Sequence, residues 1–152
     1  MKTIVRCLVA GIIISSLLTS CGKNVGVVAS PIEGSWVLTD AAKGNATGWR
    51  PLYTGLERGV FTFYANGSAS YDDGFSKYQG SWNIYTSTTG YYDYYGNYNT
   101  DFHDALQIQL REFSTNSSIN LYFDDVNFNS YNYFTTTYYN NFSVERYGFS
   151  RY

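Results

Sequence analysis

Aromatic side chains dominate this chain of 152 residues and constrain its fold more than any other feature. All 30 of them, 17 Tyr, 10 Phe and 3 Trp, lie at or after Trp36. Disordered segments are poor in aromatic residues and rich in charge, whereas only 14% of these residues are charged. Tyr, Phe, Thr and Asn are also weaker helix formers than Ala, Leu or Glu. The composition therefore predicts one β-rich domain, which the length of the chain also fits.

Apolar and polar residues alternate along much of this domain, which is the period of a strand with one buried face. In residues 106–111, Leu, Ile and Leu alternate with Gln, Gln and Arg, and residues 119–124 show a similar pattern. We expect an all-β domain whose antiparallel strands, about eight in number, form an up-and-down β-barrel. The expected strands span residues 34–40, 59–65, 68–73, 77–86, 105–113, 118–126, 131–139 and 142–152.

An Asn-Gly pair at residues 66–67 marks a tight turn, and the type of turn fixes which residues pair across the hairpin. A two-residue turn would place a serine opposite Phe63. A three-residue turn over residues 65–67, with its glycine left-handed, instead pairs Phe63 with Ala69. The second register unites the bulky residues, so we predict it. The predicted buried face of this hairpin consists of Phe61, Phe63, Ala69 and Tyr71.

The start of the chain has the features of a targeting signal. Lys2 and Arg6 precede an apolar stretch over residues 7–18, which is too short to span a bilayer as a helix. Residues 18–22, Leu-Thr-Ser-Cys-Gly, resemble the lipobox of bacterial lipoproteins, whose cysteine receives diacylglycerol. An ordinary secretory signal with an incidental cysteine is the alternative. We expect a lipoprotein signal peptide over residues 1–20, the acylated Cys21 and a tether over 21–31, and the folded domain over 32–152.

Lipidation of Cys21 would anchor the mature chain in a membrane through acyl chains such as palmitate. Cleavage before Cys21 leaves 8 Lys and Arg against 12 Asp and Glu, and this net negative charge argues against nucleic acid as a partner. Cys7 would be removed, which leaves no thiol for a disulfide or a metal. The residue directly after Cys21 is Gly22 and not Asp, and no acidic run of the kind that flags surface export follows Cys21. We therefore expect the outer membrane, with the domain facing the periplasm.

Four short motifs follow one another along the domain. They are Ile-Glu-Gly-Ser-Trp at residues 32–36, Phe-Thr-Phe with Asn-Gly at 61–67, Gly-Ser-Trp-Asn-Ile at 80–84 and Tyr-Gly-Phe-Ser-Arg at 147–151. Their order resembles that of the small lipocalin-like domains of Bacteroidota lipoproteins. The resemblance covers the whole domain and implies a lipocalin-like barrel with a habit of binding ligands.

In the lipocalin family a Gly-x-Trp strand opens the barrel, and a late arginine packs over the tryptophan to seal one end. Carried over to this chain, the resemblance implies that Arg151 lies over Trp36 in a cation–π contact. The residues expected to point inward are bulky. We therefore expect a narrow or filled interior, with any pocket at one open end.

The sequence carries little that indicates catalysis or metal binding. His103 is the only histidine, and the Gly-x-Ser-x-Gly elbow of many serine hydrolases is absent. A zinc site lacks further His and free Cys ligands. Asp and Asn in residues 93–104 are candidate calcium ligands, but they are also ordinary turn residues, which is the interpretation we favour. We expect no catalytic residue, no metal and no cofactor.

Residues 86–104 are dense in Tyr, Gly and Asn, a pattern that fits either a long loop or an irregular extra hairpin. Tyrosine combines a flat apolar ring with a hydroxyl group, which suits the binding of sugars or protein surfaces. A solvent-facing surface that binds nothing would have the same composition. The candidate ligand-binding residues are Tyr91, Tyr92, Tyr94, Tyr95, Asn97, Tyr98 and Asn99.

The expected function is non-enzymatic binding in the cell envelope, with a small amphipathic molecule or a glycan as the ligand. The alternative is a protein-interaction or structural lipoprotein, an accessory of an envelope complex that it contacts through exposed Tyr-rich surfaces.

Overall fold

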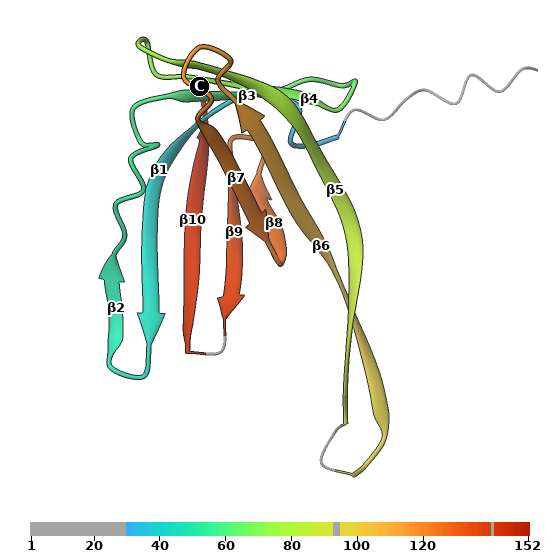
Figure 1. The fold of residues 1–152 in the computed structure, drawn as a ribbon. Helices are drawn as coiled ribbons and strands as arrows, with labels where there is room; N and C mark the ends of the chain where they lie inside the picture. Colours follow the sequence, from blue (N-terminus) through green and yellow to red (C-terminus); the bar gives the residue numbers. More distant parts are fainter. Residues whose placement is uncertain (1–29, 93–94, 141) are drawn as a thin grey trace, which may run out of the picture.

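The computed structural model describes residues 30–92, 95–140 and 142–152 (Figure 1). The predicted signal peptide and Cys21 lie outside these ranges. The strands are β1 (Gly34–Asn45), β2 (Gly48–Pro51), β3 (Val60–Phe63), β4 (Ser68–Asp72), β5 (Lys77–Tyr92), β6 (Tyr98–Arg111), β7 (Ser118–Phe123), β8 (Asp125–Ser130), β9 (Tyr133–Asn140) and β10 (Ser143–Arg151). The prediction of an all-β domain is confirmed. Within the described ranges no helix has the length and hydropathy to cross a membrane.

The strands form one antiparallel sheet in the order β7-β6-β5-β4-β3-β1-β10-β9-β8, with β2 paired to the far half of β1. Most strands lie beside their neighbours in the chain, as in an up-and-down sheet. The sheet is strongly curved, so that β3 and β4 cross the upper part of Figure 1 while β9 and β10 run almost at right angles to them. The edge strands β7 and β8 are not paired with each other, so the hydrogen-bonded ladder is not closed.

The sheet has ten strands where about eight were predicted, and two local features explain the difference. Residues 48–51 fold back on β1 as the short strand β2. The strand predicted over residues 118–126 divides at Asp124 into β7 and β8. The backbone N–H of Asp124 donates to the carbonyl of Thr137 at 2.8 Å, and its carboxylate accepts the N–H of Tyr139 at 2.7 Å. The chain therefore leaves β6 at this corner and continues beside β9.

The β3–β4 hairpin has the predicted register. Phe63 pairs with Ala69 and Phe61 pairs with Tyr71. The N–H of Tyr64 donates to the carbonyl of Ser68 at 3.0 Å, which closes the three-residue turn. The glycine of this turn has a φ of +80°, in the left-handed region. All four residues predicted on the inner face are buried.

Aromatic rings pack together on the inner face of the sheet. The rings of Phe134 and Phe149 are stacked with their centroids 4.7 Å apart, and Trp36 meets Phe134 edge to face at the same distance. Phe61 contacts Phe149 at 5.9 Å. Such ring pairs contribute about 0.5–1.5 kcal/mol each beyond the burial of their area. This cluster joins β1, β3, β9 and β10 into one hydrophobic core.

Residues 86–104, for which the sequence left a loop and a hairpin open, extend the β5–β6 hairpin. The pairing of β5 with β6 continues without interruption from Gln79 and Arg111 to Tyr92 and Tyr98. β4 accompanies β5 only to Ser81, and β7 accompanies β6 only from Leu106. Beyond these points the hairpin projects from the sheet, toward the lower right of Figure 1.

Gly80 lies where β5 approaches β6 so closely that a side chain has no room. A Cβ atom at this position would lie 2.0 Å from the carbonyl oxygen of Gln109. We expect Gly80→Ala to lower the free energy of unfolding by about 1–3 kcal/mol, as overpacked sites do, in urea denaturation followed by fluorescence. The exposed neighbour Ser81 provides the control, since Ser81→Ala should change stability by less than about 0.5 kcal/mol. Equal stability of the two variants would contradict the close approach.

Candidate functional site

The predicted ligand-binding residues that the structure describes belong to the projecting end of the β5–β6 hairpin. Tyr95 and Tyr98 are 85% and 62% exposed, and Asn97 between them is also exposed. The side chains of the other predicted residues, Tyr91, Tyr92, Tyr94 and Asn99, lie outside the described part of the structure. The hairpin thus brings the described Tyr and Asn side chains together at one tip, as neighbours in sequence.

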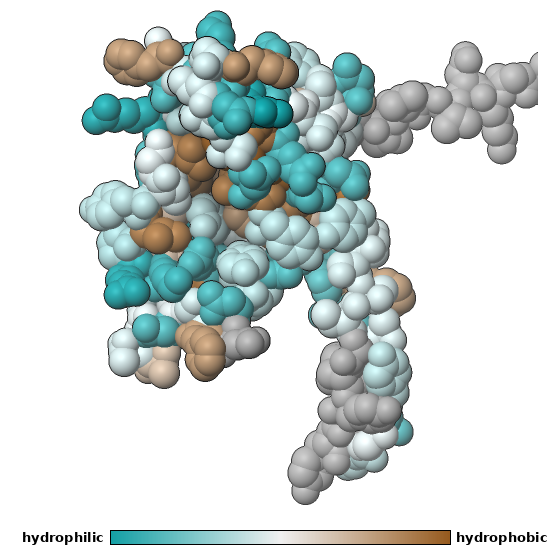
Figure 2. Space-filling model, in the orientation of Figure 1, coloured by the Kyte–Doolittle hydropathy of each residue, from teal (hydrophilic) through white to brown (hydrophobic). Residues whose placement is uncertain are grey.

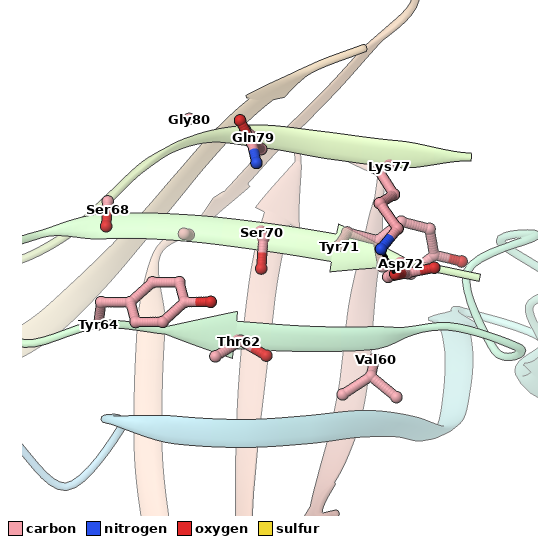
Figure 3. A pocket seen from close by; sticks show the side chains of 11 residues that line it. Val60, Thr62, Tyr64, Ser68, Ser70, Tyr71, Asp72, Lys77, Gln79 and Gly80 are labelled. Carbon is pink, nitrogen blue, oxygen red and sulfur yellow. Dashed lines mark ion pairs between the residues drawn. The ribbon is translucent and has the colours of Figure 1, made fainter. Parts of the chain in front are cut away.

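A groove of 680 Å³ lies on the outer face of β3, β4 and β5, and we call it the β3–β5 groove (Figure 3). Its side chains alternate along each strand with the buried aromatic residues of the inner face. The register that points the core residues of the hairpin inward therefore points these groove side chains outward. The polar side chains that line the groove are Thr62, Tyr64, Ser68, Ser70, Asp72, Lys77 and Gln79.

Hydroxyl and amide groups form the middle of the groove. Ser70 of β4 pairs with Gln79 of β5 on one side and with Thr62 of β3 on the other. The hydroxyl of Thr62 lies 3.1 Å from that of Ser35 on β1, which continues the polar row across the sheet. These groups offer donors and acceptors to a ligand with several hydroxyls.

An aromatic ring and an ion pair border the two ends of the groove (Figure 3). Tyr64 is 48% exposed, and its backbone carbonyl accepts the indole N–H of Trp82 at 3.0 Å, which fixes its position. At the other end the ammonium of Lys77 lies 2.9 Å from the carboxylate of Asp72. The Lys77 hydrogen bond, together with the N–H of Gly74, lowers the pKa of Asp72. Both groups are therefore charged at neutral pH.

A second recess of 430 Å³ lies between β1, β2 and the segment that follows β2. The indole of Trp49 is 55% exposed and lies against Gly44. The guanidinium carbon of Arg146 is 5.1 Å from the centre of the indole. Pro51 and the exposed Tyr53 also line this recess, which makes it more apolar than the β3–β5 groove.

His103 lines a third recess of 500 Å³ between the β5–β6 hairpin and β9. The sequence placed Asp101 beside this histidine, but the corner between β7 and β8 adds Asp124 and Asp125. Sequence analysis did not place these two carboxylates near His103, because they approach it only at the corner where the chain leaves β6. No group of three or more His, Cys, Asp or Glu residues that could hold a metal is present in the described part of the chain.

Arg151 lies over Trp36, in the contact that the family resemblance implies. Its guanidinium carbon is 4.4 Å from the centre of the Trp36 ring and 4.3 Å from the centre of the Tyr131 ring. Its nitrogens donate to the backbone carbonyls of Tyr131, Glu33 and Pro31 at 3.0, 3.1 and 3.3 Å. One side chain thus ties the start of the domain to its end.

Gly34 explains the Gly-x-Trp pattern in physical terms. Its φ of +122° is unfavourable for residues with a side chain, and a Cβ atom would lie 2.5 Å from Nη1 of Arg151. The indole N–H of Trp36 donates to the carbonyl of Ile32 at 2.7 Å, which holds the ring below the guanidinium. The glycine therefore provides the space that the arginine occupies.

Comparisons of the chain with family models, with curated proteins and with solved structures find no match. The lipocalin-like resemblance thus stays a prediction that rests on the sequence motifs. The structure itself shows the contact between Arg151 and Trp36 and a sheet whose strands follow one another almost in chain order.

The contacts of Arg151 require a planar group with several donors. We expect Arg151→Lys to lower the free energy of unfolding by about 1–3 kcal/mol, because an ammonium cannot serve three carbonyls and stack between two rings. Chemical denaturation measures this loss. Arg58→Lys is the matched control, since Arg58 is exposed, and it should change stability by less than about 0.5 kcal/mol. A loss of equal size in both variants would contradict the special role of Arg151.

Proposed function

We propose that this chain is a lipid-anchored, non-enzymatic binding protein of the cell envelope, with a lipocalin-like barrel and a glycan as its ligand. The β3–β5 groove is the observation that carries the proposal. It combines one exposed ring, Tyr64, with hydroxyls, an amide and charges of both signs. A sugar presents an apolar C–H face and many hydroxyls, and this combination of groups complements both.

Packing of the inner face favours a glycan over a small amphipathic molecule. An amphipathic ligand of the lipocalin kind needs apolar space inside the barrel. In this chain the centre of the inner face carries the contacting rings of Trp36, Phe61, Phe134 and Phe149. The polar outer groove is therefore the better candidate for a binding site, and its ligand should be polar.

The proposed lipid anchor determines where in the cell envelope binding would occur. Acylation of Cys21 leaves a tether of ten residues before residue 32, which spans at most about 35 Å when extended. The domain would then stay close to the outer membrane, with the periplasmic side as the proposed location. Glycans of the cell envelope lie within this reach.

The glycan proposal is tested by binding of the intact lipoprotein, in detergent, to an array of cell-envelope glycans, followed by calorimetry with the best ligand. Tyr64→Ala should weaken binding at least about fivefold, since an aromatic ring that contacts the ligand contributes more than about 1 kcal/mol. Gln79→Ala should weaken it in the same direction.

Two further variants remove exposed rings from the other recesses and act as controls. Trp49→Ala and Tyr139→Ala should bind as the wild type does. Binding that is lost in Trp49→Ala and kept in Tyr64→Ala would move the site to the second recess, and binding to no glycan would refute the proposal.

The anchor has its own test, which does not depend on the ligand. Cells that express the chain and receive an alkyne analogue of palmitate should label the wild type, and the label should be lost in Cys21→Ser. The wild-type chain should fractionate with the outer membrane, and protease added to whole cells should spare it. Labelling of Cys21→Ser at the wild-type level would exclude lipidation at this residue.

A protein-interaction role is the second candidate function, and the projecting β5–β6 hairpin favours it. Exposed aromatic residues outside the hairpin are dispersed over turns, such as Phe75 and Phe142, and over strands, such as Trp49 on β2. On the face shown in Figure 2, the brown apolar areas are small and separated by hydrophilic ones. A partner would therefore contact a strand edge rather than one large apolar surface.

A further inference from the structure

Within the described residues, no strand pairs with the outer edge of β5 over much of its length. β4 pairs with β5 over residues 77–81, and the N–H of Trp82 donates to the carbonyl of Gly67 at 2.9 Å. Beyond Trp82, the only described strand that pairs with β5 is β6. No described strand occupies the other side of residues 83–89.

The backbone groups that face this open side follow from the hydrogen bond of Trp82. In an antiparallel ladder, alternate residues direct both N–H and C=O to the same neighbour. Trp82 directs its N–H toward β4, so Ile84, Thr86 and Thr88 direct theirs to the open side. The residues between them pair with β6. Three donors and three acceptors therefore line the edge.

Other exposed edges of this sheet carry features that discourage pairing. In β2, Pro51 removes a backbone donor. At the corner between the edge strands β7 and β8, Asp124 and Asp125 place two carboxylates. Both are devices by which proteins protect strand edges.

Residues 83–89 of β5 carry no such protection. Their sequence is Asn-Ile-Tyr-Thr-Ser-Thr-Thr, without charge or proline, and it consists mainly of residues that favour strands. Seven residues also exceed the length of β2, β3, β4, β7 and β8 in this sheet. Such an edge is suited to adding a strand.

We propose that two copies of this chain pair antiparallel along residues 83–89 of β5, so that their two sheets become one. A second copy is the occupant that the edge favours, because a strand that pairs antiparallel with itself obeys a two-fold axis. Each donor of one edge then meets an acceptor of the other. The edge is neutral, so the axis brings no like charges together.

Disulfide trapping tests this pairing in the full chain, in native membranes. Single cysteines replace Ile84, Tyr85, Thr86, Ser87 and Thr88 in turn, and the wild-type chain gives the background. Opposed Cα atoms in an antiparallel pair lie about 4.5–5.5 Å apart, within the range of a disulfide. One or two neighbouring positions at the axis should therefore give disulfide-linked dimers after mild oxidation. The exposed turn residue Ser114, changed to Cys, should stay at background.

A second measurement keeps the proposal falsifiable if cysteines disturb the strand. Light scattering on the detergent-solubilised chain should give twice the protein mass of one chain. Thr88→Pro removes a donor that faces the edge and spares the donors that pair with β6, so it should give the mass of one chain. Thr88→Val keeps the donor and should remain dimeric. A monomeric wild type, or trapping no stronger at any β5 position than at Ser114→Cys, would overturn the proposal.

Discussion

The packing of Trp36 against Phe134, and of Phe134 against Phe149, is the interaction on which the rest of the structure depends. These residues come from β1, β9 and β10, and their contact brings the start and the end of the domain together. β1 pairs with β10 on one side and with β3 on the other, so the curvature of the sheet continues from β1 into the β3–β4 hairpin. Arg151 then covers Trp36 from outside the core. The outer face of β3, β4 and β5 carries the β3–β5 groove.

A sheet with a packed inner face must express its function on its outside or at its ends. Under the proposed function, the small polar residues of the β3–β5 groove therefore matter as much as the aromatic core behind them. Thr62 and Ser70 alternate with Phe61 and Tyr71, so the same two strands build both surfaces. A change of register by one residue would exchange the two faces and destroy both.

The sequence was most informative where two local signals agreed. The register of the β3–β4 hairpin could be predicted because the Asn-Gly turn and the alternation of Phe61 and Phe63 point to one pairing. The corner at Asp124 was harder to predict, although the spacing of the apolar residues around it is one sign of it. Phe123 and Val126 are both buried but lie three residues apart, which breaks the period of two.

Other features depend on the curvature of the sheet, which no local pattern encodes. The outward position of Ser70 follows from the hairpin register, but the hollow of the groove does not. Tyr, Thr and Asn are equally common in loops and on exposed strands, so residues 86–104 gave no signal to choose between them. The contact of Arg151 with Trp36 followed from the resemblance, whereas its three carbonyl partners required the structure.

The pairing of β1 with β10 also determines when the chain can fold. Trp36 pairs with Arg151, so the first strand of the sheet waits for the last residues to be synthesised. A chain still emerging from a ribosome or a translocation channel can form the β3–β4 hairpin, but it cannot pack Trp36 against Phe134 or cover it with Arg151. Pairing over such a long sequence separation is slow, and the core forms late. If the predicted signal peptide directs export through a narrow channel, this delay would keep the polypeptide unfolded during its passage.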